Sequence, residues 1–330
     1  ISYCYSKGLV ITAGTTKGGL MGSGTATNSY YDSITSGQSD NSGKGVPKST
    51  TEMKKMGTFA NWDFGNIWTI DEDKGYPELI WQHYLWTGTA GDNLWTTPLN
   101  WNKRSGYPST NGDKAFINSA IPAGLSTPAD TLTLGGLQLG PSFSGALTLG
   151  GPLTLDNSGI RGGALRTLAG TLDASATNYT IDVSGNYQKA AAAKFVPRAG
   201  TVNFSNPANH SLVAGSTTFF NFGAVAGKTL TFEAASTQTI NGALNLPGIS
   251  GSPITMVSTM AATRWNINPT GTRNVTYTNV KDSNNTNPTA IININGIDNG
   301  NNVNWNFGNW LLTSSSNANG TISPLGGLAV

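Results

Sequence analysis

The most constraining feature of this sequence is a series of short triplets in which apolar, polar and apolar residues alternate. They recur from about residue 125 onward, and Gly, Asn, Pro or Ser follows most of them. The triplets are Leu132–Leu134, Leu137–Leu139, Leu147–Leu149, Leu153–Leu155, Ile181–Val183, Val202–Phe204, Leu230–Phe232, Leu244–Leu246, Ile254–Met256, Trp265–Ile267, Val275–Tyr277 and Trp305–Phe307. Side chains alternate across a strand, so the outer residues of each triplet share one face. The pattern predicts very short strands separated by turns.

Two all-β architectures could contain such strands. A β-sandwich needs longer strands, about seven in ~100 residues. A β-solenoid needs many very short strands, one on each face of each coil, with apolar side chains stacked along its axis. The nearly regular spacing of the triplets between residues 244 and 277 favours the solenoid. We therefore predict an all-β parallel β-solenoid, a right-handed β-helix, formed either as one body or as two stacked segments.

Composition supports this fold class and narrows the function. Charged residues make up 11% of the chain, against roughly 25% in an average domain, and 42 residues are Gly. The 19 basic and 17 acidic residues leave a net charge of +2 without a basic block, so a nucleic-acid partner is not expected. No apolar run approaches the length of about 18 residues that a transmembrane helix requires. Cys4 is the sole cysteine, which excludes an intramolecular disulfide and a multi-Cys zinc site.

The first quarter of the chain carries a second set of motifs. They are Ser2–Ser6, Gly18–Gly22, Ser29–Asp32, Thr35–Gln38, Thr50–Lys54, Trp62–Phe64, Ile67–Asp71 and Gly75–Leu79. In order and spacing they resemble the end of a GLUG-repeat region, a module of large bacterial surface proteins. The resemblance implies a β-solenoid end over residues 1–82. The chain departs from it at Ser23 and Gly24, where an aromatic residue is expected.

Later motifs resemble parts of secreted bacterial adhesins. Trp86–Trp95, with Asn100–Asn102 and Gly112–Asp113, resembles the opening of autotransporter-associated β repeats. Residues 200–307 are similar to passenger regions of secreted adhesins, with Asn279–Asn285 and Gly300–Asn302 as a closing segment, and residues 315–327 resemble the start of another small β module. These resemblances imply a connector or cap over 83–124, a β-helix over 125–307 and a following β module over 308–330. They also imply export and display at the cell surface. No signal peptide is visible in residues 1–20, and the chain opens in mid-pattern, so we expect a piece of a larger protein.

The sequence offers no catalytic motif. His83 and His210 lie far apart, without zinc spacing, and neither a Gly-x-Ser-x-Gly elbow nor a Walker loop occurs. The strongest enzymatic alternative is polysaccharide cleavage, which would need carboxylates gathered on adjacent coils. The candidate acids are Asp156, Asp173, Asp182, Glu233, Asp282 and Asp298. No two occupy an obviously equivalent position in neighbouring coils, and Asp182 should point outward from its triplet, so no catalytic residue is expected.

Two clusters suggest ligands, and each has a plainer interpretation. Asp71–Asp73 could contribute oxygen ligands to calcium, but it lacks the order of an EF-hand loop, so a solvated turn is the favoured interpretation. Trp86, Trp95 and Trp101 could stack sugar rings, whereas the plainer interpretation is that they plug the end of the solenoid. No metal or other cofactor is predicted.

These observations predict a structural or adhesive module of a large secreted bacterial cell-surface protein. A surface or matrix polysaccharide, or further copies of the chain, would be its partner. The alternative is a carbohydrate-binding or polysaccharide-cleaving β-helix.

Overall fold

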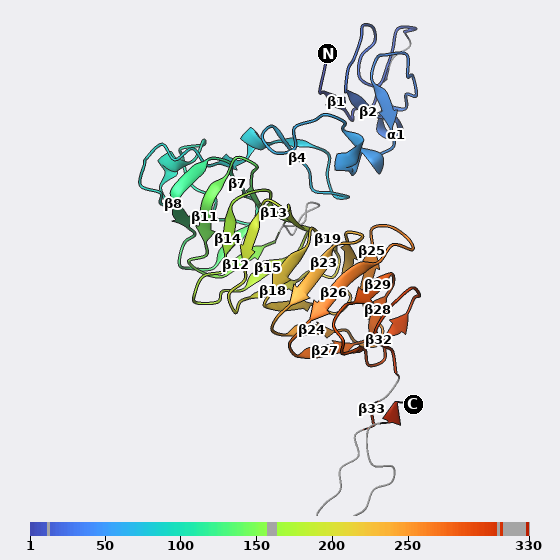
Figure 1. Ribbon diagram of the computed structural model, residues 1–330. Helices are drawn as coiled ribbons and strands as arrows, with labels where there is room; N and C mark the ends of the chain where they lie inside the picture. Colours follow the sequence, from blue (N-terminus) through green and yellow to red (C-terminus); the bar gives the residue numbers. More distant parts are fainter. Residues whose placement is uncertain (12–13, 157–163, 309–310, 313–327, 330) are drawn as a thin grey trace, which may run out of the picture.

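The computed structural model confirms the parallel β-solenoid (Figure 1). It describes residues 1–11, 14–156, 164–308, 311–312 and 328–329. Short strands follow one another around three faces, and each strand pairs in parallel with the strand one coil before and one coil after it. Coils differ in length because turns of different size join the strands. Asn284 bonds to Asn266, 18 residues earlier, whereas Asn274 bonds to Asn245, 29 residues earlier.

The first face is a ten-stranded parallel sheet. Its strands are β6 (Tyr84–Leu85), β7 (Lys114–Ile117), β10 (Gly136–Leu139), β13 (Ala164–Thr167), β16 (Tyr187–Lys189), β19 (His210–Ala214), β22 (Thr229–Phe232), β25 (Ile254–Ser258), β28 (Thr278–Val280) and β31 (Ile297–Asp298). Each strand lies beside the next in this order, so the sheet runs the length of the solenoid.

The second face consists of two four-stranded sheets. The earlier sheet contains β8 (Ala120–Ser126), β11 (Ser144–Thr148), β14 (Thr171–Asp173) and β17 (Lys194–Val196). The later one contains β20 (Thr217–Phe219), β23 (Thr237–Ile240), β26 (Trp265–Pro269) and β29 (Ser283–Asn285). Gly215 precedes β20 at a tight corner: its φ is +82°, and a Cβ there would lie 1.8 Å from the Lys189 carbonyl oxygen, so only glycine fits.

The third face is a seven-stranded parallel sheet. Its strands are β9 (Leu132–Leu134), β12 (Leu153–Leu155), β15 (Ile181–Val183), β18 (Thr201–Phe204), β21 (Asn221–Ala224), β24 (Leu244–Pro247) and β27 (Arg273–Thr276). Beyond it, β30 (Ile291–Ile292) pairs in parallel with β32 (Trp305–Asn306). The last described residues are β33 (Leu311–Leu312) and β34 (Leu328–Ala329), which pair antiparallel.

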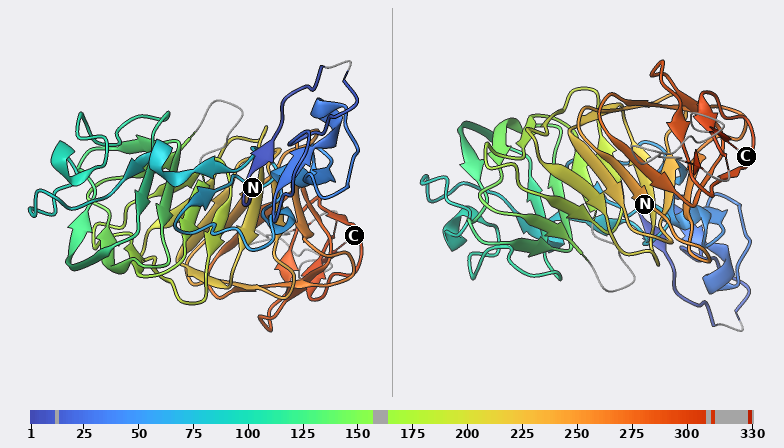
Figure 2. Two further views of the ribbon diagram at one scale, coloured as in Figure 1. Left: turned by 90° about the horizontal axis from the view of Figure 1, so that it is seen from above. Right: turned by 90° about the horizontal axis from the view of Figure 1, so that it is seen from below.

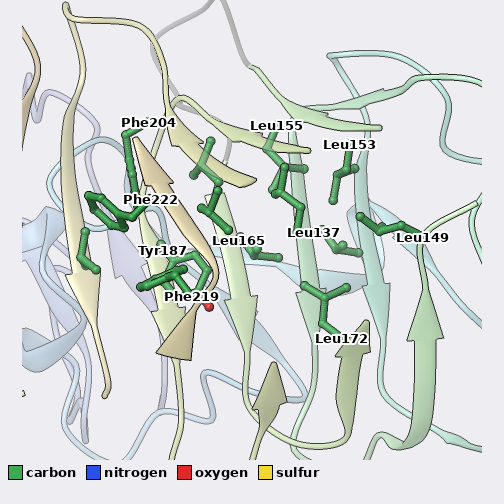
Figure 3. Close-up of a cluster of buried hydrophobic side chains, with 14 of the residues drawn as sticks. Leu137, Leu149, Leu153, Leu155, Leu165, Leu172, Tyr187, Phe204, Phe219 and Phe222 are labelled. Carbon is green, nitrogen blue, oxygen red and sulfur yellow. The ribbon is translucent and has the colours of Figure 1, made fainter. Parts of the chain in front are cut away.

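The core is built as the alternating triplets predict. Leu155 pairs with Leu134 on one side and with Val183 on the other, and all three side chains are fully buried. Figure 3 shows further inward side chains, including Leu137 and Leu165, stacked between the sheets. Each such burial contributes roughly 1.5–3 kcal/mol, and each coil covers the apolar surface of its neighbour.

The N-terminal region forms its own small sheet. Strands β1 (Tyr5–Ser6), β2 (Tyr30–Asp32) and β3 (Val46–Lys48) pair in parallel, and the one-turn helix α1 (Ser33–Ser36) follows β2. Among the described residues, no strand pairing joins this sheet to the three faces of the solenoid. Tyr30 of β2 joins a small cluster of buried hydrophobic side chains, most of them aromatic, made of Tyr30, Met53, Phe59, Trp62, Phe64 and Ile70.

Residues 52–82, which we call the strap, connect this sheet to the solenoid. The strap contains η1 (Glu52–Lys54), η2 (Met56–Thr58), β4 (Trp68–Thr69), β5 (Glu78–Leu79) and η3 (Ile80–Gln82), and β4 and β5 pair antiparallel. It lies along the outer side of the first face rather than on the solenoid axis, as hydrogen bonds from three of that face's strands show (Figure 2). After the strap, the chain enters the first coil through β6 and η4 (Pro98–Asn100).

Candidate functional site

The most extended polar feature of the solenoid is a row of outward side chains on its third face, which we call the polar row. The paired middle residues of successive strands define it as Thr133, Thr154, Asp182, Asn203, Gly223, Asn245 and Asn274. Alternation produces the row: the residues on either side of Asp182, for example, are Ile181 and Val183, which are fully buried. Asp182 therefore lies on the outward side of its strand, as expected.

Side-chain hydrogen bonds connect parts of the polar row. The Asn203 amide donates to Asp182 at 2.8 Å, and the Asn274 amide donates to Asn245 at 2.7 Å. Between these two pairs, Gly223 contributes no side chain, and a trough of about 390 Å³ opens over its backbone. The residues that line the trough include Asn203, Asn221, Asn245 and Arg273. It presents amides rather than ionisable groups that could exchange protons with a substrate.

The candidate acids bind separate, non-acidic partners. Asp173 forms an ion pair with Arg198 at 2.7 Å, which holds the pKa of its carboxyl below the usual range. The other bonded acids each accept a hydrogen bond from an amide: Glu233 from Gly215, Asp282 from Asn301 and Asp298 from Asn302. In the part of the chain that the structure describes, no hydrogen bond or ion pair joins two of these acids, and no group of three His, Cys, Asp or Glu is arranged to hold a metal ion. Each of these bonded carboxylates is therefore engaged by a group of the chain itself.

The three tryptophans that could have stacked sugars lie in the core. Trp86, Trp95 and Trp101 are at most 3% exposed, and Trp101 makes edge-to-face contacts with both others at 5.2 and 4.8 Å. Two of the buried indole N–H groups form hydrogen bonds: Trp95 donates to the Pro108 carbonyl, and Trp101 donates to the Trp95 carbonyl. Rings packed in this way have no face free for a ligand. The cluster lies at the start of the solenoid, against its first coil.

The acidic run of the strap differs in part from the expected solvated turn. Asp71 is only 8% exposed because its carboxylate meets the Lys114 ammonium of β7 at 2.9 Å. Lys114 also contacts Glu78 at 3.0 Å, so one cation is shared by two carboxylates. Glu72 accepts a hydrogen bond from the Met56 amide, and Asp73 pairs with Lys55. Asp71 therefore fastens the strap to the solenoid, whereas Asp73 is exposed in a turn over residues 72–74, as expected. The sequence could not show the role of Asp71 because Lys114 lies 43 residues away.

His83 belongs to the same cluster. Its Nε2 atom lies 3.2 Å from Glu78, but it makes no hydrogen bond there. Burial, together with the nearby Lys114 charge, lowers the pKa of His83 to about 4, so the ring is neutral at pH 7. The second histidine, His210, is exposed on β19, far from this cluster in the fold, and Cys4 is half-buried. The two histidines therefore do not form a shared site.

Other outward side chains of the first face bind the backbone of the strap. Arg166 of β13 donates to the Phe64 carbonyl at 2.7 Å, and Gln138 of β10 donates to the Gly65 carbonyl at 3.4 Å. Asn186, just before β16, donates to the Glu72 carbonyl at 3.3 Å. Burial under the strap lowers the pKa of Arg166 to about 10, still well above physiological pH. The first face is thus occupied by the chain itself over these coils.

Lys228 is a buried lysine that no pattern in the sequence indicates. Its side chain is fully buried, and its ammonium donates to the carbonyl oxygens of Ser184, Ser205 and Asn206 at 2.9, 2.9 and 3.2 Å. These carbonyls lie at the corners of the two preceding coils, where strands of the third face have just ended. Burial, with the charge of Lys74 in the strap nearby, lowers the pKa of Lys228 to about 7. An isolated lysine in a polar turn gives no sequence sign of such a role.

Comparisons with known proteins bear on a small part of the chain. No protein-family model and no solved structure matches it. The chain is 47% identical over 83 residues to a protein of Evansella cellulosilytica named "Putative Gly-rich membrane protein". The match covers 22% of this chain and 9% of the relative, so the chain corresponds to a minor part of that protein's length. Among the described residues, no helix is long and apolar enough to cross a membrane. The GLUG-repeat and adhesin resemblances stay predictions.

Proposed function

We propose that this chain is a structural or adhesive module of a large bacterial cell-surface protein. The observation that carries the proposal is the polar row: a long face of hydroxyl and amide side chains, with one carboxylate at Asp182, on a rigid parallel solenoid. Paired backbones and a shared core make such a rod stiff, and its third face repeats a polar side chain at every coil of the row except that of Gly223. Surface display outside the cell is part of this proposal.

Two further observations support it. Each candidate carboxylate that forms a hydrogen bond or an ion pair has its own non-acidic partner, so none of these contacts gathers two of them at one site. The bacterial relative carries the words "membrane protein" in its name and is much longer than the matched segment, as expected for a module of a large envelope protein. Polysaccharide cleavage remains the alternative that an experiment should address.

The test combines adhesion with product analysis. Beads carrying the purified chain are passed over surfaces coated with different bacterial and plant polysaccharides, and the fluid is assayed for new reducing ends and unsaturated sugars. The proposal predicts retention on at least one surface with no released product. Product formation that disappears in an Asp182→Asn or Asp173→Asn variant would overturn it in favour of the enzyme.

A further inference from the structure

The gap in the polar row is a place where the chain's own hydrogen bonding stops. On one side, the Asn203 amide nitrogen donates to the Asp182 carboxylate. A carboxylate can only accept, so the amide oxygen of Asn203 must face the other way, toward Gly223. A Cβ built on Gly223 would lie 3.0 Å from this oxygen, which places the oxygen directly over the gap.

The other side of the gap presents the complementary group. Asn245 uses its amide oxygen to accept from Asn274, at 2.7 Å. Its amide nitrogen has no hydrogen-bond partner among the described residues, and its side chain is exposed. An acceptor and a donor therefore face one another across two strand spacings, roughly 10 Å, with only the Gly223 backbone between them. The same row is bonded on both sides of the gap, so the opening is local.

We propose that this gap is a binding subsite for one sugar unit of a neutral polysaccharide. The inference rests on the adhesive form of the proposed function and assigns it a location. A hydroxyl group can donate to Asn203 and accept from Asn245, so adjacent hydroxyls of one sugar complete the interrupted row. The trough of about 390 Å³ over Gly223 gives the ring its space.

The chemistry of the trough selects a neutral ligand over a charged one. Arg273 in its lining is the nearest cation, but its terminal nitrogens donate to the carbonyls of Thr289, Ala290 and Pro269 and to the Asn287 side chain. The two terminal nitrogens are therefore already bonded within the chain, and the Nε atom, which has no hydrogen-bond partner among the described residues, is buried. Asp182 lies one coil before Asn203, outside the lining of the trough, and its negative charge disfavours an anionic polysaccharide that extends along the row.

The same trough disfavours a peptide. Extended peptides usually bind by adding a strand to an exposed sheet edge. Strands β18, β21 and β24 are each paired on both sides, so the backbone here has no free edge. Phe222 and Leu244 of the trough point inward and are buried, which leaves no apolar pocket for a peptide side chain. Side-chain amides spaced by coils suit a ligand that repeats its hydroxyls.

The experiment replaces Gly223 with Asn, the residue type on either side of it in the polar row, and measures polysaccharide binding. In affinity gel electrophoresis, the full chain is run through dextran, mannan and galactan as neutral probes, alginate as an anionic probe and gelatin as a peptide probe. We expect at least one neutral polysaccharide to retard the wild type. Gly223→Asn should weaken that association about tenfold, the loss of two hydrogen bonds. Thr154→Asn, which adds the same side chain to the same row three coils away, should leave it within twofold.

A second pair of variants distinguishes a loss of binding from misfolding. Asn245→Ala removes the free donor without touching the backbone, and Asn266→Ala removes an amide from an intact pair on the second face, where Asn284 donates to Asn266 at 2.9 Å. Only Asn245→Ala should weaken binding. Thermal melting of all variants serves as the control that each is folded.

Two results would overturn the subsite, and a third would contradict the proposed function. Unchanged binding in Gly223→Asn and Asn245→Ala, with the wild type still retarded, would place adhesion elsewhere and leave the proposed function standing. Retardation by alginate or gelatin alone would assign a different ligand class. Release of product in the earlier assay would instead contradict the proposed function itself, so the two failures are distinguishable.

Discussion

The solenoid and the strap are held by opposite means, although they belong to one chain. The solenoid from β7 to β31 buries one continuous apolar cluster, which packs each coil against the next. The strap has a small aromatic cluster of its own and lies on the first face through buried polar contacts, such as Lys114 with Asp71 and Arg166 with Phe64. Each coil is therefore stabilised by apolar contacts with its neighbours, whereas docking of the strap depends on a few specific polar pairs.

A charge placed in the core of the solenoid should lower its stability more than any other change considered. Leu246→Asp would bury an unpaired carboxylate at a fully buried position of β24. We expect a loss of more than about 4 kcal/mol, with melting of the surrounding coils, measured by circular dichroism. The neighbouring Asn245→Asp changes an exposed side chain and should stay within about 0.5 kcal/mol. Equal melting of both variants would refute the inward assignment.

Breaking the shared ion pair should detach the strap and spare the solenoid. Lys114→Met leaves the buried Asp71 carboxylate without its cation, at a cost of about 3 kcal/mol to docking. Hydrogen exchange should then quicken in residues 64–80 while strands β19–β28 keep their protection. Lys194→Met removes an exposed lysine of the neighbouring face and serves as the control. Loss of protection throughout the chain would mean that the two regions fold as one unit.

The buried Lys228 should give the solenoid a rising stability in mild alkali. Its folded-state pKa of about 7 lies below that of an unfolded lysine, so the unfolded chain binds more protons between these values. Unfolding free energy therefore rises as pH increases from about 7 toward 10, by on the order of 4 kcal/mol. Urea titrations across this range should show the rise in the wild type and a smaller one in Lys228→Met. Parallel profiles would contradict the burial of a charge there.

His83 should give the strap a smaller response on the acid side. Its folded pKa of about 4 lies below the unfolded value, so the stability it contributes is present above about pH 6.5 and is lost as pH falls to 4. We expect about 1 kcal/mol of weaker docking, seen as faster exchange in the strap at pH 5 than at pH 7 after correction for intrinsic rates. His83→Gln should remove this difference, and the exposed His210→Gln should not.

The sequence revealed the solenoid because its core repeats locally. Ile181, Asp182 and Val183 show in three residues which side chains face inward, and the same order recurs in most coils. The strap contacts are invisible to such a pattern. Lys114 and Asp71 are 43 residues apart and Asn186 and Glu72 are 114 apart, and nothing in their local context marks them as partners.

The candidate site was only partly predictable for a related reason. Alternation placed Asp182 outward, and the same rule applies to Asn203 and Asn245 in their triplets. The register that aligns Gly223 between them depends on turn lengths that vary from coil to coil, so the gap could not be located from the sequence. For the three tryptophans, the sequence allowed two interpretations, a sugar-stacking platform or a plug of the solenoid end. Only their burial in the structure distinguishes the two.

In the solenoid, the outward residues that define the polar row follow one line along the third face, rising by one strand spacing per coil. Spin labels at Thr133→Cys and Asn274→Cys, in a Cys4→Ser background, test it directly by electron–electron resonance. The two positions are separated by six successive strand pairings along the row, so a label separation centred near roughly 29 Å is predicted. A distribution centred below about 20 Å, as a folded-back two-layer sandwich would give, contradicts the solenoid and everything built on its outer face.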